Sequence, residues 1–386
     1  MSQQALATAA GLSSFRVRTA VEQLTQLMLL DIQQEQIISI QTYGVHPLTR
    51  AFVQTQLGSS PEYEQEARVC WSGYYVKFAR QHLVRGKQND RYWNTLVRSG
   101  GAMEIDREWF NLLNVLEWAD HTKQHQVLIE LVLLLSHYMN RHFHYNERLY
   151  YSRKAALAAE ILNDLECAAL FRIDTLGWTL IETKRLEEAE QEITAGLSIA
   201  QALHPVSPRT VDLLALAHIL LARVFLEQGL LKKAEVSIDH AATLDSSPVI
   251  QFRAAMIAGD IAYKKKELQK AIQLYNQAHR ISLQYGQEGE DEDLAYHLGM
   301  AYLATKDPIQ AEQSFKNLPN LPERYSGVTT GVIYIKLGEA YVARINNNYE
   351  EARRLVQEAL SYLSLVSDAS HWMHDEIQRF LEEGRE

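Results

Sequence analysis

The sequence predicts an all-α fold of helical repeats, preceded by a small domain that contains one β-hairpin. The 386-residue chain is poor in helix-breaking residues, with 18 glycines and 8 prolines. A pattern of small residues also recurs over its second half, which is typical of a repeat array. With 47% hydrophobic and 22% charged residues, the chain is globular rather than disordered.

Charge and composition exclude several classes of protein. The formal net charge of −10 argues against a protein that coats nucleic acid or an anionic membrane. The N-terminus has no basic stretch before an apolar core, and the longest apolar run, residues 127–135, is too short to span a membrane. Cys70 and Cys167 cannot form a disulfide framework or a cysteine-based zinc site. We expect a cytoplasmic protein in which both thiols are buried.

Residues 1–57 predict a winged-helix domain that is truncated at its N-terminus. Residues 4–10 form its first helix, and residues 15–29 form a second helix that Ser13 or Ser14 caps. The apolar face of the second helix contains Val17, Ala20, Val21, Leu24, Leu27 and Met28. Residues 29–40 predict a hairpin with a polar tip at 33–36. Residues 43–48 then turn into a further helix, with Pro47 in its first turn.

A winged helix can bind DNA, and here the residues that would enter the major groove are Ser13, Ser14, Arg16, Arg18 and Thr19. The charges oppose this function. Residues 1–57 hold three arginines and three acids, so their net charge is zero. Three phosphate contacts would give a salt slope of only about −3. The charges therefore argue against DNA binding and favour a winged helix used for packing.

Five similar units follow from about residue 170. Each has a small residue within one helix, a tight turn, and an alanine in the next helix with a bulky residue four positions later. The small residues are Gly177, Ala222, Gly259, Gly299 and Gly338, and the alanine pairs are Ala189 with Ile193, Ala234 with Ile238, Ala271 with Tyr275, Ala311 with Phe315, and Ala352 with Val356. Small residues occur where two helices cross closely, because a larger side chain would hold the backbones apart.

These units resemble tetratricopeptide repeats (TPR), which implies a right-handed helical superhelix. The alanines are separated by 45, 37, 40 and 41 residues, whereas the usual period is about 34. We therefore expect longer helices or longer loops, one of them at residues 203–209. The segment 371–381 predicts a final amphipathic helix that caps the array.

Residues 58–165 predict helices throughout, at 62–83, 93–99, 108–122, 125–137 and 150–161. The predicted domains are thus a winged helix at 1–57, a helical and repeat-like region at 58–165, five TPR-like repeats at 166–370, and a capping helix at 371–386.

The whole chain resembles the C-terminal half of STAND signal-transduction ATPases, which carry an NB-ARC-type nucleotide switch. The resemblance lies in residues 43–50 (YGVHPLTR), in residues 108–119 (EWFNLLNVLEWA) and in the TPR-like units. It implies that His46 senses nucleotide phosphates if an ATPase domain is present. The chain has no GxxxxGK[ST] phosphate loop. The resemblance therefore places ATP, ADP and Mg²⁺ on an upstream domain that is absent here, and makes this chain the sensor half of a cut sequence or a split gene.

Other candidate chemistry is weak. His137, His142 and His144 could hold a metal only if three imidazoles converged, and the neighbouring arginines disfavour a cation. The same weakness applies to His371 with His374 and Asp375. The acidic run at 288–293 lacks calcium-loop spacing. We expect no metal site and no cofactor in this chain, and no catalysis.

In a TPR superhelix, the first helix of each repeat lines the concave face. Helical phase places there Trp178, Arg223, Asp260, Tyr263, Tyr296, Met300, Ile335 and Glu339. This mixed set fits a protein, a peptide or a small effector better than an acidic tail. The predicted function is that of a protein- or effector-binding sensor or scaffold in a STAND-type switch. The alternative is a TPR-containing transcription regulator whose winged helix binds DNA.

Overall fold

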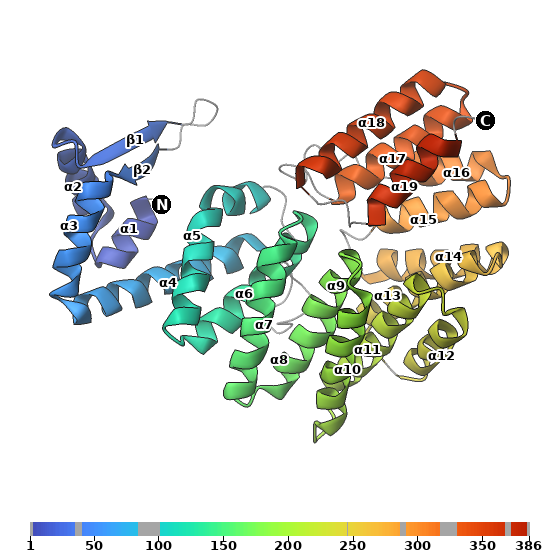
Figure 1. Ribbon diagram of the computed structural model, residues 1–386, viewed down its shortest axis with the longest axis horizontal. Helices are drawn as coiled ribbons and strands as arrows, with labels where there is room; N and C mark the ends of the chain where they lie inside the picture. The colour runs from blue at the N-terminus through green and yellow to red at the C-terminus, as the bar shows by residue number, and fades with distance from the viewer. Residues whose placement is uncertain are drawn as a thin grey trace. The chain divides into compact units, whose positions relative to one another are not determined.

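The computed structural model describes residues 3–34, 41–83, 101–244, 246–285, 291–316, 330–366 and 372–383. Within these ranges the fold is an all-α helical-repeat fold with one short pair of strands (Figure 1). Contacts between residues divide it into two compact units. The first comprises residues 3–82 and 104–131, and the second comprises the rest of the described chain, chiefly residues 132–383.

The first unit begins with α1 (Gln3–Ala10), α2 (Ser14–Gln26), β1 (Leu30–Gln34), β2 (Gln41–Val45) and α3 (Pro47–Gly58). The two strands pair antiparallel, with Leu30 opposite Val45. The Ser13 hydroxyl caps α2 by accepting a bond from the Arg16 amide at 3.4 Å, and Pro47 occupies the first turn of α3. Of the two predicted caps, Ser13 and Ser14, the structure selects Ser13, and the predicted place of Pro47 is confirmed.

The hairpin differs from its prediction in its second strand. We predicted that strand at residues 37–40, but β2 covers 41–45 and includes Gly44 and Val45, which were expected in a turn. Residues 35–40 lie outside the described residues. The predicted face of α2 is also shorter, because the helix ends at Gln26 and Met28 adopts a positive φ of 56°. Leu27 and Met28 are consequently exposed.

Two long helices complete the first unit, α4 (Pro61–Leu83) and α5 (Gly101–His121). The rings of Trp71 and Trp118 meet edge to face with centroids 6.4 Å apart, and the Tyr75 hydroxyl donates to Glu108 Oε2 at 2.6 Å. Aromatic packing and a partly buried hydrogen bond therefore join the helices. The expectation of a buried Cys70 is wrong, since this residue is exposed on α4, whereas Cys167 is buried. The helix predicted at 93–99 falls outside the described residues.

The repeat helices continue from α6, within which the division between the units falls. They are α6 (His125–Arg141), α7 (Tyr145–Ile161), α8 (Leu165–Leu170), a π-helical turn η1 (Phe171–Gly177), α9 (Trp178–Glu182), α10 (Leu186–Ala202), α11 (Pro208–Glu227), α12 (Leu231–Ala242), α13 (Pro248–Lys264), α14 (Leu268–Tyr285), α15 (Asp291–Ala304), α16 (Pro308–Lys316), α17 (Thr330–Ile345), α18 (Tyr349–Val366) and α19 (Trp372–Glu383). α8, η1 and α9 together form the first helix of the first predicted repeat.

The predicted close crossings are confirmed within three repeats. A Cβ atom added at Gly177 would lie 2.5 Å from Ile193. The same addition at Gly259 would bring it closer than 3.0 Å to Tyr275, and at Gly299 closer than 3.0 Å to Phe315. The bulky residue of the second helix thus fills the space that the glycine of the first helix leaves.

A second periodic feature was not predicted. The turns between paired helices place one residue in the left-handed region, and the amide that follows bonds to a carbonyl five residues back. In the turns after Lys123, Lys184 and Lys306, for example, these bonds are 2.8 Å from Gln124 to Ala119, 2.8 Å from Arg185 to Leu180 and 3.0 Å from Asp307 to Tyr302. The left-handed residues are Lys123, Phe143, Asn163, Lys184, Gly229, Lys266, Lys306 and Asn347. This is the Schellman arrangement. It extends the repeat geometry back to α5 and α6.

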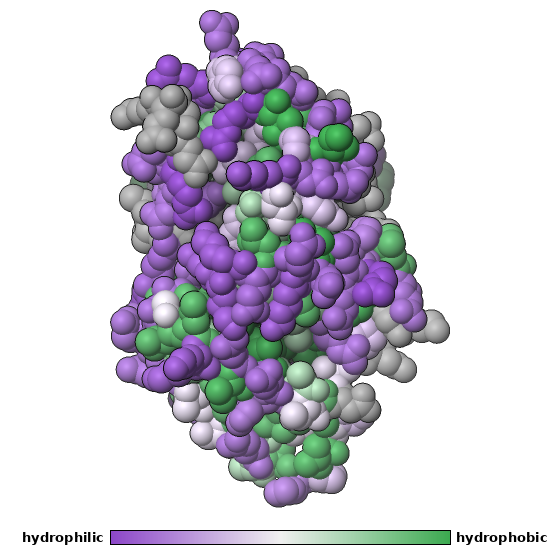
Figure 2. Space-filling model, turned by 90° about the vertical axis from the view of Figure 1, so that its right-hand side faces the viewer, coloured by the Kyte–Doolittle hydropathy of each residue, from purple (hydrophilic) through white to green (hydrophobic). Residues whose placement is uncertain are grey.

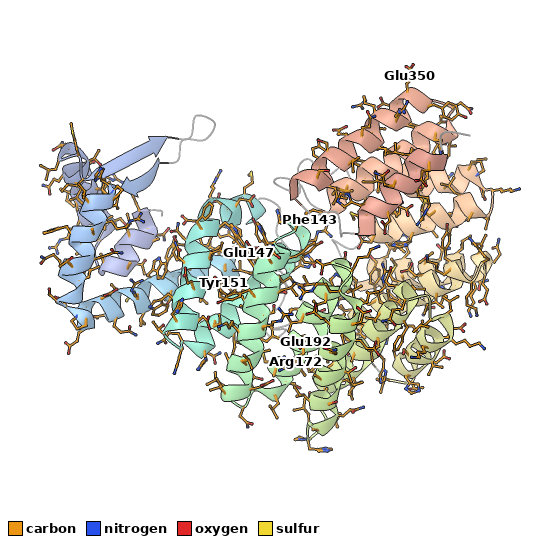
Figure 3. All side chains as sticks on the ribbon, in the orientation of Figure 1. Phe143, Glu147, Tyr151, Arg172, Glu192 and Glu350 are labelled. Carbon is orange, nitrogen blue, oxygen red and sulfur yellow. The ribbon has the colours of Figure 1, made fainter. Side chains whose placement is uncertain are left out.

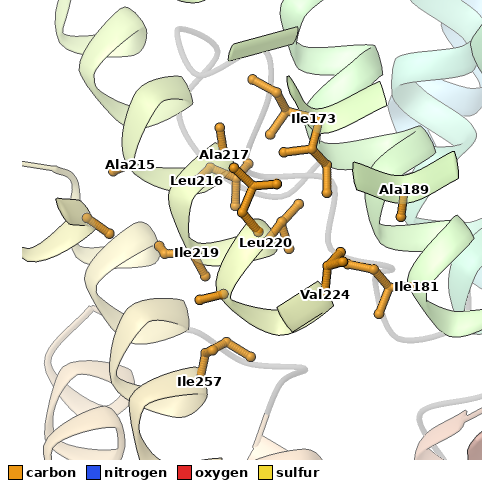
Figure 4. Close-up of a cluster of buried hydrophobic side chains, with 14 of the residues drawn as sticks. Ile173, Ile181, Ala189, Ala215, Leu216, Ala217, Ile219, Leu220, Val224 and Ile257 are labelled. Atoms are coloured by element: carbon orange, nitrogen blue, oxygen red, sulfur yellow. The ribbon is translucent and has the colours of Figure 1, made fainter. Parts of the chain in front are cut away.

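The second unit has its apolar core between successive helix pairs. One cluster joins η1, α9, α10, α11, α12 and α13, and includes Ile173, Leu220 and Ile257 (Figure 4). A second cluster joins α15–α19 and also contains Phe143 and Tyr145, from the α6–α7 turn and the start of α7. On the face drawn in Figure 2, hydrophilic side chains predominate and apolar ones form small groups.

Candidate functional site

The eight predicted binding residues lie on the first helices of the repeats, α9, α11, α13, α15 and α17; we call this surface the first-helix face. Trp178, Tyr263, Met300 and Ile335 are half-buried, and Glu339 is exposed. The Arg253 guanidinium lies 5.8 Å from the centre of the Trp178 ring. The structure does not gather the eight residues into one compact site. For example, Trp178 packs against one apolar cluster, Tyr263 packs against another, and Glu339 lies at the surface.

Arg223 and Asp260 are brought together. Arg223 Nη1 lies 2.7 Å from Asp260 Oδ2, and its other nitrogen Nη2 lies 3.1 Å from Glu227. Asp260 Oδ1 also accepts a bond from the Tyr275 hydroxyl at 2.7 Å and lies 3.1 Å from His297 Nδ1. We call Asp260 and the three residues that contact its carboxylate, Arg223, Tyr275 and His297, the Asp260 centre. It links α11, α13, α14 and α15 through one buried carboxylate.

The electrostatics of the Asp260 centre favour its charged form. Burial acts to raise the pKa of Asp260, but the charge and hydrogen bond of His297 and the charge of Arg223 hold it below the usual value. Burial likewise acts to lower the pKa of His297, and the neighbouring Asp260 carboxylate outweighs it, so that pKa is raised. The centre is an ion cluster that stabilises its own charges.

Tyr296, predicted as a partner-binding residue of the concave face, is buried in this structure. It is only 3% exposed and lies in the same buried cluster as Phe315 and Tyr341. Its hydroxyl donates to Glu376 Oε1 of α19 at 2.9 Å, and the Tyr341 hydroxyl donates to the same oxygen at 3.3 Å. Asp260 is also buried, at 7% exposed. These two residues therefore offer little surface to a partner in this structure.

A second polar group surrounds the π-helical turn. Arg148 of α7 is buried and donates to Ser136 and Asn140, each at 3.1 Å, and to the Thr179 hydroxyl. Burial lowers the pKa of Arg148 to about 10. Arg253 Nη1 pairs with Asp174 at 2.9 Å. Arg148 thus links α7 with α6 and with α9, which directly follows the π-helical turn, and Arg253 ties the turn itself to α13.

The same turn is joined to its partner helix at the surface. Arg172 Nη1 lies 2.7 Å from Glu192 Oε2 of α10, a pair labelled in Figure 3. Arg172 Nη2 also reaches Glu160 of α7 at 2.9 Å. π-Helical turns are rare and are often found at functional sites.

The candidate metal ligands do not form a cation site in the described ranges. There, no group of three or more His, Cys, Asp or Glu side chains is arranged to hold a metal ion. His142 stacks on Tyr138 at 4.2 Å. Burial lowers the pKa of His137 to about 3, helped by the charges of Arg141, Arg148 and Arg253. His371 and residues 288–290 lie outside the described residues.

His46 has a local structural role at the start of α3. Its Nδ1 atom accepts a bond from the Leu48 amide at 3.3 Å and so caps that helix. The nucleotide-sensing role that the family resemblance implies for His46 stays a prediction.

Sequence reasoning missed His297, Glu376 and Arg148 as polar centres. His297 lies two positions before the small residue of its repeat, Gly299. In earlier repeats this position is apolar: Leu220 lies before Ala222, and Ile257 lies before Gly259. The repeat register therefore predicts a core residue there. Arg148 lies in a region without a recognised repeat unit, so no register was available for it. The sequence does contain a signal for Glu376, because this acid interrupts the apolar face of residues 373–380.

The chain is similar in sequence to a known regulatory protein. The chain is 36% identical over 339 residues to the transcription activator GutR of Bacillus subtilis (strain 168). The match covers 88% of this chain and 40% of the relative, so the chain spans about two fifths of that relative's length. No protein-family model matches the chain.

Two solved structures are similar to the chain at low identity. BtubC (BKLC) from P. vanneervenii is 16% identical with a TM-score of 0.44, covering 57% of this chain and 91% of that one. A STAND protein with a tetratricopeptide repeat sensor from Pyrococcus horikoshii is 13% identical with a TM-score of 0.38, covering 94% and 54%. At these scores neither likeness defines the function of this chain.

In the part of the chain that the structure describes, no helix is long and apolar enough to cross a membrane. The chain is a helical-repeat protein that is similar in sequence, over most of its own length, to part of a transcription activator.

Proposed function

We propose that this chain is the sensor part of a transcription regulator: a non-catalytic helical-repeat module whose first-helix face binds a protein, peptide or small effector. The observation that carries the proposal is the 36% identity to a transcription activator over 88% of the chain. A relative that covers so much of the repeat array supports a regulatory role for the array itself.

The first-helix face offers suitable binding chemistry. Trp178 and Tyr263 present half-buried aromatic rings, each with a cation nearby, Arg253 at 5.8 Å and Lys266 at 6.0 Å. Half-buried aromatic side chains supply much of the energy of protein interfaces. The polar centres behind them hold adjacent repeats in register, so a bound ligand would bias how those repeats pack.

The finer proposal is a STAND-type switch. The module would then act in cis with an NB-ARC-type ATPase domain that binds ATP or ADP with Mg²⁺, and His46 would sense the nucleotide. On this proposal the chain alone binds no nucleotide, because the phosphate-binding loop belongs to the other domain. A fluorescent ATP analogue titrated into the isolated chain should show no saturable binding.

Direct DNA binding by α2 is the second candidate. Arg16, Arg18 and Thr19 are exposed on this helix, and GutR is a transcription activator. Anisotropy of a labelled random duplex at low salt tests it. Tight binding with a steep salt dependence, lost in Arg16→Ala/Arg18→Ala, would support this candidate over packing.

The main proposal is tested in the organism with the gene in its natural context. Trp178→Ala and Tyr263→Ala are introduced separately, and RNA sequencing compares the transcripts with those of the unaltered strain. We expect a discrete set of transcripts to change in the same direction in both variants. Ile309→Ala, an exposed position on the second helix α16, is the matched control. Unaltered transcripts in both variants, at normal protein levels, would contradict the proposal.

A further inference from the structure

The last helix, α19, is held by one amphipathic face. Met373, Ile377 and Phe380 of this helix are buried at 1%, 0% and 4% exposed. They are spaced four and three residues apart and so share one side of the helix. Glu376 lies on the same side and is also buried. Figure 1 shows α19 beside α17 and α18.

The surface that receives α19 is rich in donors and cations. The hydroxyls of Tyr296 and Tyr341 donate to Glu376, the Arg344 guanidinium lies 4.4 Å from the Phe380 ring, and Lys184 pairs with Asp375. We call these four residues, Lys184, Tyr296, Tyr341 and Arg344, the α19 seat. Two hydroxyl donors and two cations therefore surround an apolar centre, and α19 supplies the matching acids.

The α19 seat takes residues from earlier repeats as well as from the last one. A capping helix needs contacts only with the last repeat, α17 and α18. Here Tyr296 comes from α15, and Lys184 comes from the turn between α9 and α10, 191 positions before Asp375. The buried cluster around Ile377 also includes Phe143, which Figure 3 labels near α7. α19 thus lies against residues of the first-helix face, where a ligand is expected.

We propose that the α19 seat is a binding site for an acidic amphipathic helix of a partner protein, and that α19 is an internal occupant which the partner displaces. The inference rests on the proposed function, because it names the partner of the first-helix face. The complementarity of α19 itself defines the partner: apolar residues at i, i+4 and i+7, with a carboxylate at i+3 for the tyrosine pair and another at i+2 for the lysine.

Several features make α19 exchangeable. It has 12 residues, a length at which a helix is unstable without tertiary contacts. An ion pair between Lys184 and Asp375 connects it to the first repeat. The two side chains are 35% and 67% exposed, and ion pairs this exposed contribute little to stability. Its covalent tether gives it a high effective concentration, so a partner must bind better than α19 or bind when α19 is released.

The experiment uses the full chain and a fluorescein-labelled peptide with the sequence of residues 367–386. In the chain Ile377→Asp/Phe380→Asp, the internal helix cannot occupy the seat, so anisotropy should show saturable peptide binding. The unaltered chain should bind at least about tenfold more weakly, because its own α19 competes. Gln378→Asp, on the exposed side of α19, is the matched control and should behave as the unaltered chain.

Specificity is tested on both sides of the contact. A peptide carrying Glu376→Lys should lose at least about tenfold in affinity for the open chain, since a cation would face Tyr296 and Tyr341. Adding Tyr296→Phe/Tyr341→Phe to the open chain keeps the shape of the seat and should also weaken binding. No binding by a folded open chain, or binding indifferent to these changes, would overturn the inference.

A second measurement serves if the open chain does not fold. Hydrogen exchange of the unaltered chain is followed with and without excess unlabelled peptide. Faster exchange in the chain's own α19 shows displacement, and unchanged exchange at saturating peptide overturns the inference.

The failure of this inference can be told apart from the failure of the proposed function. If Trp178→Ala alters transcripts but the peptide displaces nothing, the inference fails and the proposed function stands. If the peptide displaces α19 while Trp178→Ala and Tyr263→Ala leave transcripts unchanged, the proposed function fails.

Discussion

The Tyr296 hydroxyl donates to Glu376 at 2.9 Å across 80 positions of sequence, and both side chains are buried. This bond connects the first helix of the fourth repeat with the helix that follows the fifth. The carboxylate has further donors in Tyr341 and in Arg379, which lies 2.7 Å away. A buried acid with two donors on other helices fixes α19 in one register, because sliding the helix by one residue would remove the acid from both tyrosine hydroxyls.

Tyr296→Phe should lower the free energy of unfolding by about 1–3 kcal/mol, since a hydrogen bond to a buried charged group is lost while the ring remains. Urea unfolding followed by circular dichroism measures the effect. Tyr302→Phe, a half-buried tyrosine on the same helix, is the control and should change stability little. Equal effects of both substitutions would refute a specific role for the bond to Glu376.

Asp260→Asn should destabilise the second unit by about 3–5 kcal/mol, because Arg223 and His297 would lose their shared buried counter-charge. Glu339→Gln is a matched control. Glu339 also follows the glycine of its repeat, but it is exposed and pairs with its neighbour Lys336 at 3.1 Å. The thermal midpoint should fall markedly in the first variant alone, and similar midpoints would argue against an organising role of the Asp260 centre.

His297 should stabilise the fold in its protonated form. Its pKa is raised above the ordinary 6.5 by Asp260, against the effects of burial and of Arg223. Its contribution is therefore fully present below pH 6.5 and is lost as the pH rises through the raised value. The stability difference between the unaltered chain and His297→Gln should shrink as the pH increases. A difference independent of pH would show that the pKa of His297 does not change when the chain unfolds.

His137 should act with the opposite sign. Burial, together with Arg141, Arg148, Arg253 and His142, lowers its pKa to about 3 from 6.5. The unfolded chain then binds a proton that the folded chain does not, so stability is lost as the pH falls from 6.5 towards 3, by up to about 1.4 kcal/mol per pH unit. Chemical denaturation in a pH series should show a shallower acid loss in His137→Gln. His279→Gln, a substitution at an exposed position, is the control and should leave the acid loss of stability unchanged. An equal change in both variants would show that the loss does not come from His137.

Gly299→Ala should cost about 1–3 kcal/mol, because the new Cβ would lie closer than 3.0 Å to the Phe315 ring and force the helices apart. Phe315→Leu in the same chain should recover part of the loss by giving the methyl group room. Gly73→Ala on α4, where nothing lies within 4 Å of the added atom, is the control and should be neutral or slightly stabilising. Simple additivity in the double variant would mean that the two helices do not cross at this pair.

The sequence by itself determined the helical content, the cap at Ser13, the place of Pro47 in the first turn of α3, and the pairing of Gly177, Gly259 and Gly299 with bulky residues one helix later. These features depend on near neighbours and on a period that the residues themselves display. The turn geometry escaped sequence reasoning, because lysine, asparagine and in one turn phenylalanine adopt the left-handed conformation, and glycine does so in only one of the eight described turns. A residue without the usual preference takes it when the packing of two helices demands it.

Only the tertiary structure decided which polar residues meet. The phase of each helix places Asp260 and Tyr296 on the first-helix face, but their burial depends on the angles between successive helices. The contacts of Glu376 with Tyr296 and of Asp375 with Lys184 join segments that no local pattern relates. Those angles result from many weak side-chain contacts summed over the array, and a one-dimensional pattern does not encode their sum.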